Sequence, residues 1–413
     1  MEDIYIKEIL VNDVRNLKNF HIPLLNDKKI NLIITGKNGS GKTSLLQELK
    51  KFLTAATNGT LQSYDNVSKA LTNLENQKKQ LKADATPQQI QELDNNIKNH
   101  KDWFINLGGT KIEFNYPLLI QQYFQNGDFI IAFFEAKRNT ALKVPTGINK
   151  INIKPTYQID EHAGTEFIQY IVNLKADRSF AKDDNDNETV TKIDKWFNDF
   201  EENLFKLFDN DNIKLQFDRK KYNFNLIEDS KEPYNLNQLS DGYSAILSIV
   251  TELIMRMEEH KVKSYDVQGI ILVDEIETHL HIELQKKVLP FLTSFFPKIQ
   301  FIVTTHSPFV LSSIDNAVIC DLEKKIVTTD LTGYSYDTLI ESYFDSDKYS
   351  IVLKEKIEEY ENLKEKQQTL SEDEKDKLLQ LKIYLNEIPK FISDELAVKL
   401  QQIKLKDLKK KEQ

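Results

Sequence analysis

The eight residues from Gly36 to Thr43 constrain the fold of this chain more than any other stretch. They read GKNGSGKT and satisfy the pattern GxxxxGK[ST] in full. The apolar residues 30–34 before them are typical of a buried strand, and residues 44–49 after them favour a helix. A glycine-rich turn between a strand and a helix lets successive backbone N–H groups point at phosphate oxygens. The sequence therefore predicts a phosphate-binding loop (P-loop) in an α/β fold.

Two side chains of this loop have expected tasks. Lys42 would reach the β- and γ-phosphates of ATP, and the Thr43 hydroxyl would hold Mg²⁺. ATP and Mg²⁺ are thus the expected cofactors. The predicted nucleotide-binding residues of the loop are Gly36, Asn38, Gly39, Ser40, Gly41, Lys42, Thr43 and Ser44.

A second apolar segment, residues 269–273, ends in two carboxylates, Asp274 and Glu275. Asp274 matches a Walker B aspartate, which holds Mg²⁺ through water, and is predicted as the second metal-site residue. Glu275 is placed to act as general base on the attacking water. A merely solvated strand end is the alternative explanation, and the P-loop earlier in the chain disfavours it.

Two more motifs complete an ordered series. LSDGYS, residues 239–244, precedes an apolar-periodic helix with Ser240 as its expected N-cap. TTHSP, residues 304–308, places His306 at the tip of a β-branched strand. The order P-loop, LSDGYS, ILVDE, TTHSP resembles the ABC-type ATPase head, with its Walker A, signature, Walker B and switch-histidine motifs. The resemblance implies an α/β fold with a mixed sheet and flanking helices, and catalytic roles for three side chains: Lys42, Glu275 and His306.

The resemblance also has a consequence for assembly. In ABC-type ATPases the signature motif of one subunit closes over the ATP held by the P-loop of another. It implies that Ser240 and Gly242 contact the γ-phosphate in trans, in a homodimer or a higher even homo-oligomer. The motif departs from the usual LSGGQ at Asp241 and Tyr243. This departure argues against a transporter subunit and fits the recombination and repair branch.

Further residues support that branch. Residues 4–24 resemble the opening of RecF, SMC and OLD-like ATPases, where an N-x-R-x-L turn joins two strands before the P-loop. The resemblance implies that Arg15 lies near the adenine or the ribose, a surface arginine being the alternative. The run DEIETHLH, residues 274–281, resembles the D-loop region of the same group. Its two histidines, His279 and His281, are expected at a dimer seam rather than on a metal ion.

The region before the signature is less clearly defined by the sequence. Residues 129–139 predict a strand that ends in a basic turn, as this group often has near its Q-loop. Gln121 and Gln122 are candidates for the Q-loop glutamine, with surface polarity as the alternative. Within the region that follows, helices are expected at about 164–174 and 188–208.

Helical additions to the head are also expected. Residues 64–104 carry apolar residues in a broken seven-residue rhythm, and Thr86 before a proline marks a helix start, so a helical hairpin is predicted. A second hairpin, with a capping box at Ser371, is predicted near the C-terminus. The expected domains are an ATPase head, 1–335, with the insertion 64–104 and a signature-bearing lobe, 141–260, followed by a helical region, 336–413.

Composition limits location and partners. The chain has 413 residues, a net charge of −9 and one cysteine, Cys320. A single cysteine excludes a disulfide framework and suits the cytoplasm, and no apolar run approaches the roughly 20 residues that span a bilayer. The negative charge argues against a generally basic nucleic-acid surface, although a local basic groove stays open.

Taken together, these features resemble the stand-alone ABC-type ATPase subunits of bacterial anti-phage systems, such as the PtuA family of Septu and retron systems and the AriA family of PARIS. The resemblance implies a slow ATPase that scaffolds or restrains a separate nuclease or toxin and releases it on a phage-derived trigger. No nuclease pattern follows residue 330, so the effector is expected on another chain. The alternative is a RecF-like repair or recombination ATPase that binds DNA.

Overall fold

The computed structural model describes residues 2–24, 27–80, 86–138, 142–229, 232–258, 265–329, 331–339, 351–366 and 370–387. The chain divides into two compact units, Met1–Tyr334 and Ser335–Gln413. Asn139, at the end of the expected basic turn, lies outside the described residues.

The centre of the first unit is a six-stranded sheet with the order β12-β11-β3-β10-β9-β5. All neighbours are parallel except β12, which pairs antiparallel with β11. The parallel strands are buried almost throughout, as strands covered on both faces must be. This mixed sheet with flanking helices confirms the predicted fold class. Its strands are β3 (Asn31–Thr35), β5 (Phe129–Phe134), β9 (Gln268–Val273), β10 (Ile299–Thr304), β11 (Ala317–Asp321) and β12 (Ile326–Thr329).

The parallel pairing decides where the motifs meet. Ile34 is paired with Thr304, and Val273 is paired with both Val303 and Phe134. The P-loop, the Walker B acids, the TTHSP motif and the turn after β5 each follow one of these strands. Because parallel strands share one direction, their carboxyl ends bring these four segments to one edge of the sheet.

A smaller antiparallel sheet, with the order β2-β1-β4, is joined to the first by a shared core. Helix α1 (Lys42–Thr57) starts at the end of the P-loop and packs its apolar face against β4 and α4. Leu45, Leu49 and Phe52 of α1 lie in one cluster with Ile9 and Ile112 of the small sheet. The elements of this part are β1 (Ile6–Val14), β2 (Leu17–Pro23), β4 (Thr110–Phe114), η2 (Pro117–Leu119) and α4 (Ile120–Gln125).

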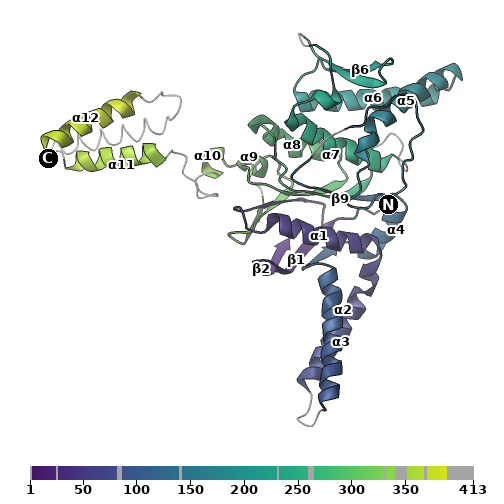
Figure 1. Ribbon diagram of the computed structural model, residues 1–413, viewed down its shortest axis with the longest axis horizontal. Coiled ribbons are helices and arrows are strands. Elements are labelled where there is room, and N and C mark those ends of the chain that lie inside the picture. Colours follow the sequence, from purple (N-terminus) through teal and green to yellow (C-terminus); the bar gives the residue numbers. More distant parts are fainter. Residues whose placement is uncertain are drawn as a thin grey trace. The chain divides into compact units, whose positions relative to one another are not determined.

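A helical hairpin lies between α1 and β4, where the insertion 64–104 is expected. It consists of α2 (Tyr64–Lys79) and α3 (Pro87–Asn106), after the short turn η1 (Thr60–Ser63), and the two helices run side by side in Figure 1. Thr86 caps α3 reciprocally with Gln89, because each backbone N–H donates to the other side chain. Two ion pairs tie the helices together: Lys78 with Asp94 and Lys101 with Glu75.

The signature lobe, residues 142–258, combines helices with a small sheet of order β6-β7-β8. Its first helix runs nine residues past the expected end at 174, because its charged residues stay at the surface and Arg178 pairs with Asp194 of the next helix. Helix α7 follows the signature motif and is buried along most of its length. The lobe contains η3 (Gly164–Glu166), α5 (Phe167–Asp183), α6 (Asn187–Phe208), β6 (Lys214–Asp218), β7 (Asn223–Ile227), β8 (Tyr234–Asn235), η4 (Leu236–Gln238) and α7 (Asp241–Met257).

The remaining helices of the first unit are α8 (Ile282–Phe295) and α9 (Pro308–Leu311), and the second unit contains α10 (Tyr336–Thr338), α11 (Ile351–Glu365) and α12 (Glu372–Glu387). Helices α11 and α12 pack through Ile357, Tyr360, Leu381 and Leu385. Ser371 and Glu374 form the expected capping box, each accepting the other's backbone N–H. Among the described residues, no helix is both long and apolar enough to cross a membrane.

Candidate functional site

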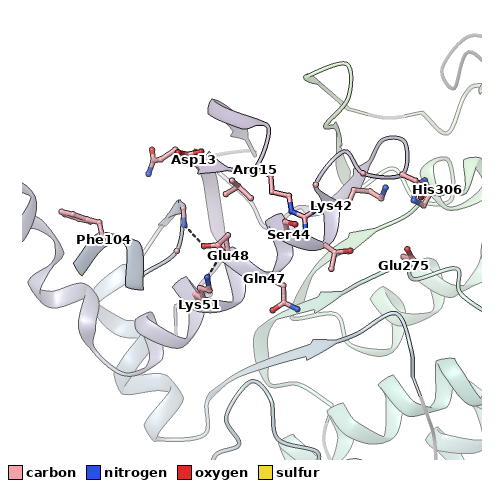
Figure 2. Close-up of a pocket in the computed structure, with 18 residues that line it drawn as sticks. Asp13, Arg15, Lys42, Ser44, Gln47, Glu48, Lys51, Phe104, Glu275 and His306 are labelled. Carbon is pink, nitrogen blue, oxygen red and sulfur yellow. Dashed lines mark hydrogen bonds and ion pairs between the residues drawn. The ribbon is translucent and has the colours of Figure 1, made fainter. Parts of the chain in front are cut away.

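One cavity of about 870 Å³ collects most of the predicted site residues at the carboxyl edge of the large sheet. Figure 2 shows Lys42, Glu275 and His306 at one end of this cavity, with Arg15 further along it and Phe104 at the other end. The predicted residues that line it are Arg15, Asn38, Gly39, Gly41, Lys42, Thr43, Ser44, Glu275 and His306. Ser40 and Asp274 adjoin these in the chain, and Gly36 lies two residues before Asn38, whereas Ser240 and Gly242 lie at the start of α7.

The backbone of the P-loop requires glycine at two positions in particular. Gly36 has φ 133° and Gly41 has φ 101°, which L side chains rarely adopt. A Cβ on Gly36 would also meet the Ser40 Oγ at 2.9 Å. Because Gly41 immediately precedes α1, the loop delivers its N–H groups at the N-terminus of a 16-residue helix.

Lys42 lies across the mouth of this loop. Its Nζ donates to the carbonyl oxygens of Gly36 at 2.8 Å and Lys37 at 3.2 Å. Burial lowers the pKa of Lys42, and the carboxylates of Glu275, Glu277 and Asp274 oppose that shift. Within the described part of the chain, the hydrogen bonds of this ammonium group go to carbonyl oxygens alone, and the group lines an open cavity, so it is well placed to bind an anion.

The hydroxyl of Ser40 is buried and has no hydrogen-bond partner among the described residues. A buried hydroxyl in a turn of inward-facing N–H groups is a donor that a phosphate oxygen can satisfy. The Thr43 side chain and the carboxylate of Asp274 are oxygen ligands of the kind that Mg²⁺ prefers. The residues present therefore fit a nucleotide phosphate with a bound magnesium ion.

The Walker B acids are held by the neighbouring strand. Thr304, at the end of β10, donates its hydroxyl hydrogen to Asp274 Oδ1 at 2.6 Å and accepts the backbone N–H of Glu275 at 2.7 Å. Asp274 is 4% exposed, so this oxygen is fixed in a buried site. Glu275 follows in the left-handed region, with φ 44°, and its side chain turns into the cavity.

His306 sits opposite these acids. Its backbone N–H donates to Glu277 Oε1 at 2.6 Å, so the Walker B turn also holds the TTHSP loop. Burial lowers the pKa of His306, and the Lys42 charge adds to the shift. The imidazole is consequently neutral at physiological pH and can accept a hydrogen bond.

The signature motif does not line this cavity. Ser240 occupies the N-cap position of α7, as expected, but its side chain makes no capping hydrogen bond. Ser240 and Asp241 are exposed, whereas Gly242 is buried. A Cβ on Gly242 would lie 2.9 Å from the His279 carbonyl oxygen, so this glycine is also needed for packing against the D-loop. Tyr243, at the position of the usual glutamine, stacks on Phe208 with ring centroids 4.3 Å apart.

The sequence pattern did not single out three residues that hold the site: Thr304, Glu277 and Arg138. Arg138, in the basic turn after β5, donates to three carbonyl oxygens of the Walker B turn. Two of them had a signal in the sequence. Glu277 is the second glutamate of the run DEIE, and Arg138 lies in the predicted basic turn after β5. Gln121 and Gln122 lie on α4 and do not line this cavity.

Parts of the chain are similar in sequence to a Septu protein and to a probable ATPase of a retron. It is 42% identical over 91 residues to "Septu protein PtuA" of Bacillus mycoides (strain KBAB4), a match that covers 22% of this chain and 13% of that protein. It is 33% identical over 160 residues to "Retron Ec83 probable ATPase" of Escherichia coli, covering 36% of this chain and 29% of that protein. The matched segments thus span less than a third of either relative.

The solved structures that match the chain include two SMC heads. "Crystal structure of the SmcHead bound to the C-winged helix domain of ScpA" has a TM-score of 0.38 and 13% identity, and covers 78% of this chain and 96% of that chain. A second SMC head, derived from Pyrococcus furiosus, has a TM-score of 0.36 and 12% identity, with 79% of this chain and 95% of that chain covered.

The match to a protein family is more extensive. Residues 32–312, from β3 through the TTHSP motif to α9, match the family AAA_21, described as "AAA domain, putative AbiEii toxin, Type IV TA system". This segment contains the P-loop, the signature, the Walker B acids and the histidine motif in the order that the sequence analysis describes. The resemblance to ATPases of defence systems is thereby confirmed. The chain belongs to the AAA_21 family of AAA-domain proteins.

Proposed function

We propose that this protein is an ATP-driven switch: it binds ATP with Mg²⁺ in the 870 Å³ cavity, hydrolyses it slowly, and controls a separate nuclease or toxin in anti-phage defence. The observation that carries the proposal is the meeting of Lys42, Glu275 and His306 around one cavity. These residues come from three chain segments, and their side chains are a phosphate-binding cation, a candidate base and a neutral imidazole.

Each side chain has a role that its position supports. Lys42 and the N–H groups of the P-loop bind phosphate oxygens, and Thr43 and Asp274 hold the magnesium ion, which neutralises phosphate charge when bound. Glu275 takes the proton of the attacking water, since its carboxylate points into the cavity from a turn fixed by Thr304. Arg15 lines the same cavity beyond the phosphate end, which supports a role at the adenine or the ribose.

The exposed signature supports assembly around ATP. Ser240 and Asp241 lie exposed at the N-terminus of α7 and do not line the cavity of their own chain. A helix N-terminus carries a partial positive charge and free N–H groups, so it suits the γ-phosphate held by a second copy. Two such contacts in a symmetric homodimer would complete two composite sites, and higher even oligomers could be built from that dimer.

The relatives support the link to an effector. The names of the matched proteins place them in the Septu and retron systems and call one of them a probable ATPase. The helical hairpin α2–α3 and the second unit, residues 335–413, are additions to the ATPase head that supply surfaces for a partner chain. The partner would be a nuclease or toxin, released on a phage-derived trigger.

Native mass spectrometry tests this proposal. The tagged protein is purified from its own operon with ATP and Mg²⁺, and the same preparation of Lys42→Ala serves as the nucleotide-free control. The proposal predicts even numbers of this subunit together with a second protein chain of nuclease or toxin type. Recovery of an ATP-dependent dimer that carries DNA and no second protein would instead favour the RecF-like repair function.

A further inference from the structure

Arg138 makes an unusual set of contacts with the Walker B turn. Its Nη1 donates to the carbonyl oxygen of Asp274 at 2.9 Å, and its Nη2 donates to those of Glu275 at 3.1 Å and Ile276 at 3.2 Å. One planar guanidinium thus satisfies three successive carbonyl groups where β9 ends. The fixed fork of donors on an arginine side chain suits such an array, and a lysine cannot reproduce it.

The turn that Arg138 holds has a backbone that needs support. Glu275 has φ 44°, a conformation that a residue with a side chain adopts only where its surroundings enforce it. On one side, β10 holds the N–H groups: Glu275 N donates to Thr304 Oγ1 at 2.7 Å and Ile276 N to Thr304 O at 3.0 Å. Arg138 holds the carbonyl groups of the same residues. The turn is therefore fixed through both its donors and its acceptors.

The environment keeps Arg138 charged. Burial lowers its pKa to about 10, and Glu277, Asp274 and Glu275 oppose the shift, so the guanidinium is protonated at neutral pH. Within the described residues its Nε is buried without a partner, and all of its hydrogen bonds go to the Walker B turn. Among the described residues, the hydrogen bonds of this side chain thus serve the Walker B turn alone.

Arg138 also faces the signature lobe. It lines a second cavity, of about 380 Å³, together with its neighbours Glu135 and Lys137. Other residues that line this cavity belong to the signature lobe: Gly164 and Thr165 of η3, and Ser248, Thr251 and Glu252 of α7. Arg138 therefore lies on the segment that connects the ATPase sheet with the lobe that carries the signature.

We propose that Arg138 is a positioning residue: its three hydrogen bonds fix the Walker B turn, and so the direction of the Glu275 side chain, from the connection between the ATPase sheet and the signature lobe. Arg138 does not line the nucleotide cavity, so its removal should not weaken ATP binding directly. The role in turnover rests on the proposed ATPase function, whereas the fixing of the turn can be measured without nucleotide.

The test compares three variants of the full chain with a matched control. Arg138→Met removes the charge and the donors, Arg138→Lys keeps the charge without the fork, and Arg138→Gln keeps two donors without the charge. Lys137→Met, next in the chain, changes an exposed cation that lines the same second cavity. Each protein is assayed for kcat, for the Kd of a fluorescent ATP analogue, and for hydrogen exchange of residues 274–280 without nucleotide.

For Arg138→Met we expect kcat to fall about 10- to 100-fold, as for the loss of other groups that orient a reactive side chain, with the Kd within about twofold of the parent. Exchange in residues 274–280 should speed up while exchange in the P-loop stays unchanged. The lysine and glutamine variants should recover only part of kcat, and Lys137→Met should match the parent in every measurement.

Three results would overturn the inference. The first is a rate of hydrogen exchange in residues 274–280 of Arg138→Met that equals that of the parent. The second is a kcat of Arg138→Met equal to that of the parent, or a loss of ATP affinity as large as the loss of kcat. The third is failure of all three Arg138 variants to fold, which would make the residue an element of the core. A parent chain that hydrolyses no ATP would instead sink the proposed function, and the exchange data would still decide the role of Arg138.

Discussion

Thr304 donates its hydroxyl hydrogen to the carboxylate of Asp274 at 2.6 Å, although the two residues are 30 positions apart in the chain. The same oxygen accepts the N–H of Glu275 at 2.7 Å. One buried hydroxyl at the end of β10 thus fixes the carboxylate of Asp274, the candidate metal ligand, and the backbone of Glu275, the candidate base. The parallel pairing of β9 and β10 makes this contact possible, because it brings the ends of both strands to the same edge.

Replacing Thr304 by Val should remove the hydrogen bonds of this hydroxyl while keeping the packing of the strand. Valine has nearly the same shape but leaves the partly buried N–H of Glu275 and one buried oxygen of Asp274 without their Thr304 partner. We expect a loss of about 1–3 kcal/mol in the free energy of unfolding, measured by urea denaturation, and a lower ATPase rate. Thr304→Ser keeps the hydroxyl and should retain most of the parent's stability and most of its ATPase rate. Equal behaviour of the two variants would show that the bridge is unimportant.

Gly242→Ala should destabilise the protein even though alanine is the better helix former. The added Cβ would lie 2.9 Å from the carbonyl oxygen of His279 and 3.2 Å from Leu284. Overpacking of this kind costs about 1–3 kcal/mol, more than the gain of up to about 1 kcal/mol in helix propensity. Thermal or urea unfolding measures the difference. Gly147→Ala is the control, since its Cβ would meet no atom within 4 Å; similar losses at both positions would contradict the packing role.

Glu252→Ala should be among the most damaging substitutions in the signature lobe. The Glu252 carboxylate accepts hydrogen bonds from Arg256 Nε at 2.7 Å and from the backbone N–H groups of Ala163 and Gly164. Its loss leaves a buried arginine charge unpaired, which costs about 3–5 kcal/mol in the free energy of unfolding. As the comparison, Lys192→Ala breaks the exposed pair with Glu188 and should leave the urea midpoint unchanged. A parental midpoint for Glu252→Ala would refute this account of the network.

His306 should make stability depend on pH in the acidic range. Burial, with help from the Lys42 charge, lowers the pKa of His306 below its ordinary value of 6.5 in the folded chain. The unfolded chain then binds more protons as pH falls through about 6.5, so this stabilising contribution is present above that pH and is lost below it. Between about pH 7 and pH 5 the parent should lose more stability than His306→Gln, measured by urea denaturation at each pH. Parallel curves for the two proteins would show that His306 titrates normally.

The sequence predicts the site to the extent that the site is contiguous. The residues of the P-loop are contiguous in the sequence, and so are the two Walker B acids. Because parallel strands bring their carboxyl ends to one edge of the sheet, the proximity of Lys42 and Glu275 follows from these two motifs. The length of α5 was underestimated because the polar residues after position 174 stay helical while facing solvent.

The supporting contacts were harder to predict. Arg138 binds backbone carbonyl groups that lie 136 to 138 residues further along the chain, and a backbone acceptor leaves no residue type to recognise. Thr304 reads as an ordinary β-branched strand residue until the pairing with Asp274 is known. The sequence motif suggests that Gly242 contacts phosphate. Its close packing against His279 could not be predicted, because it depends on how α7 packs against residues 274–281 in the folded chain.

Sedimentation velocity on Glu275→Gln tests the central claim, an ATP-driven switch built on two composite sites, most directly. This variant should bind ATP without hydrolysing it and accumulate as a dimer, or a higher even oligomer, only when ATP and Mg²⁺ are both present. Adding Ser240→Arg in the same chain should abolish that assembly while ATP binding to the monomer is retained. An oligomeric state that does not change with ATP, or assembly that survives Ser240→Arg, would contradict the account.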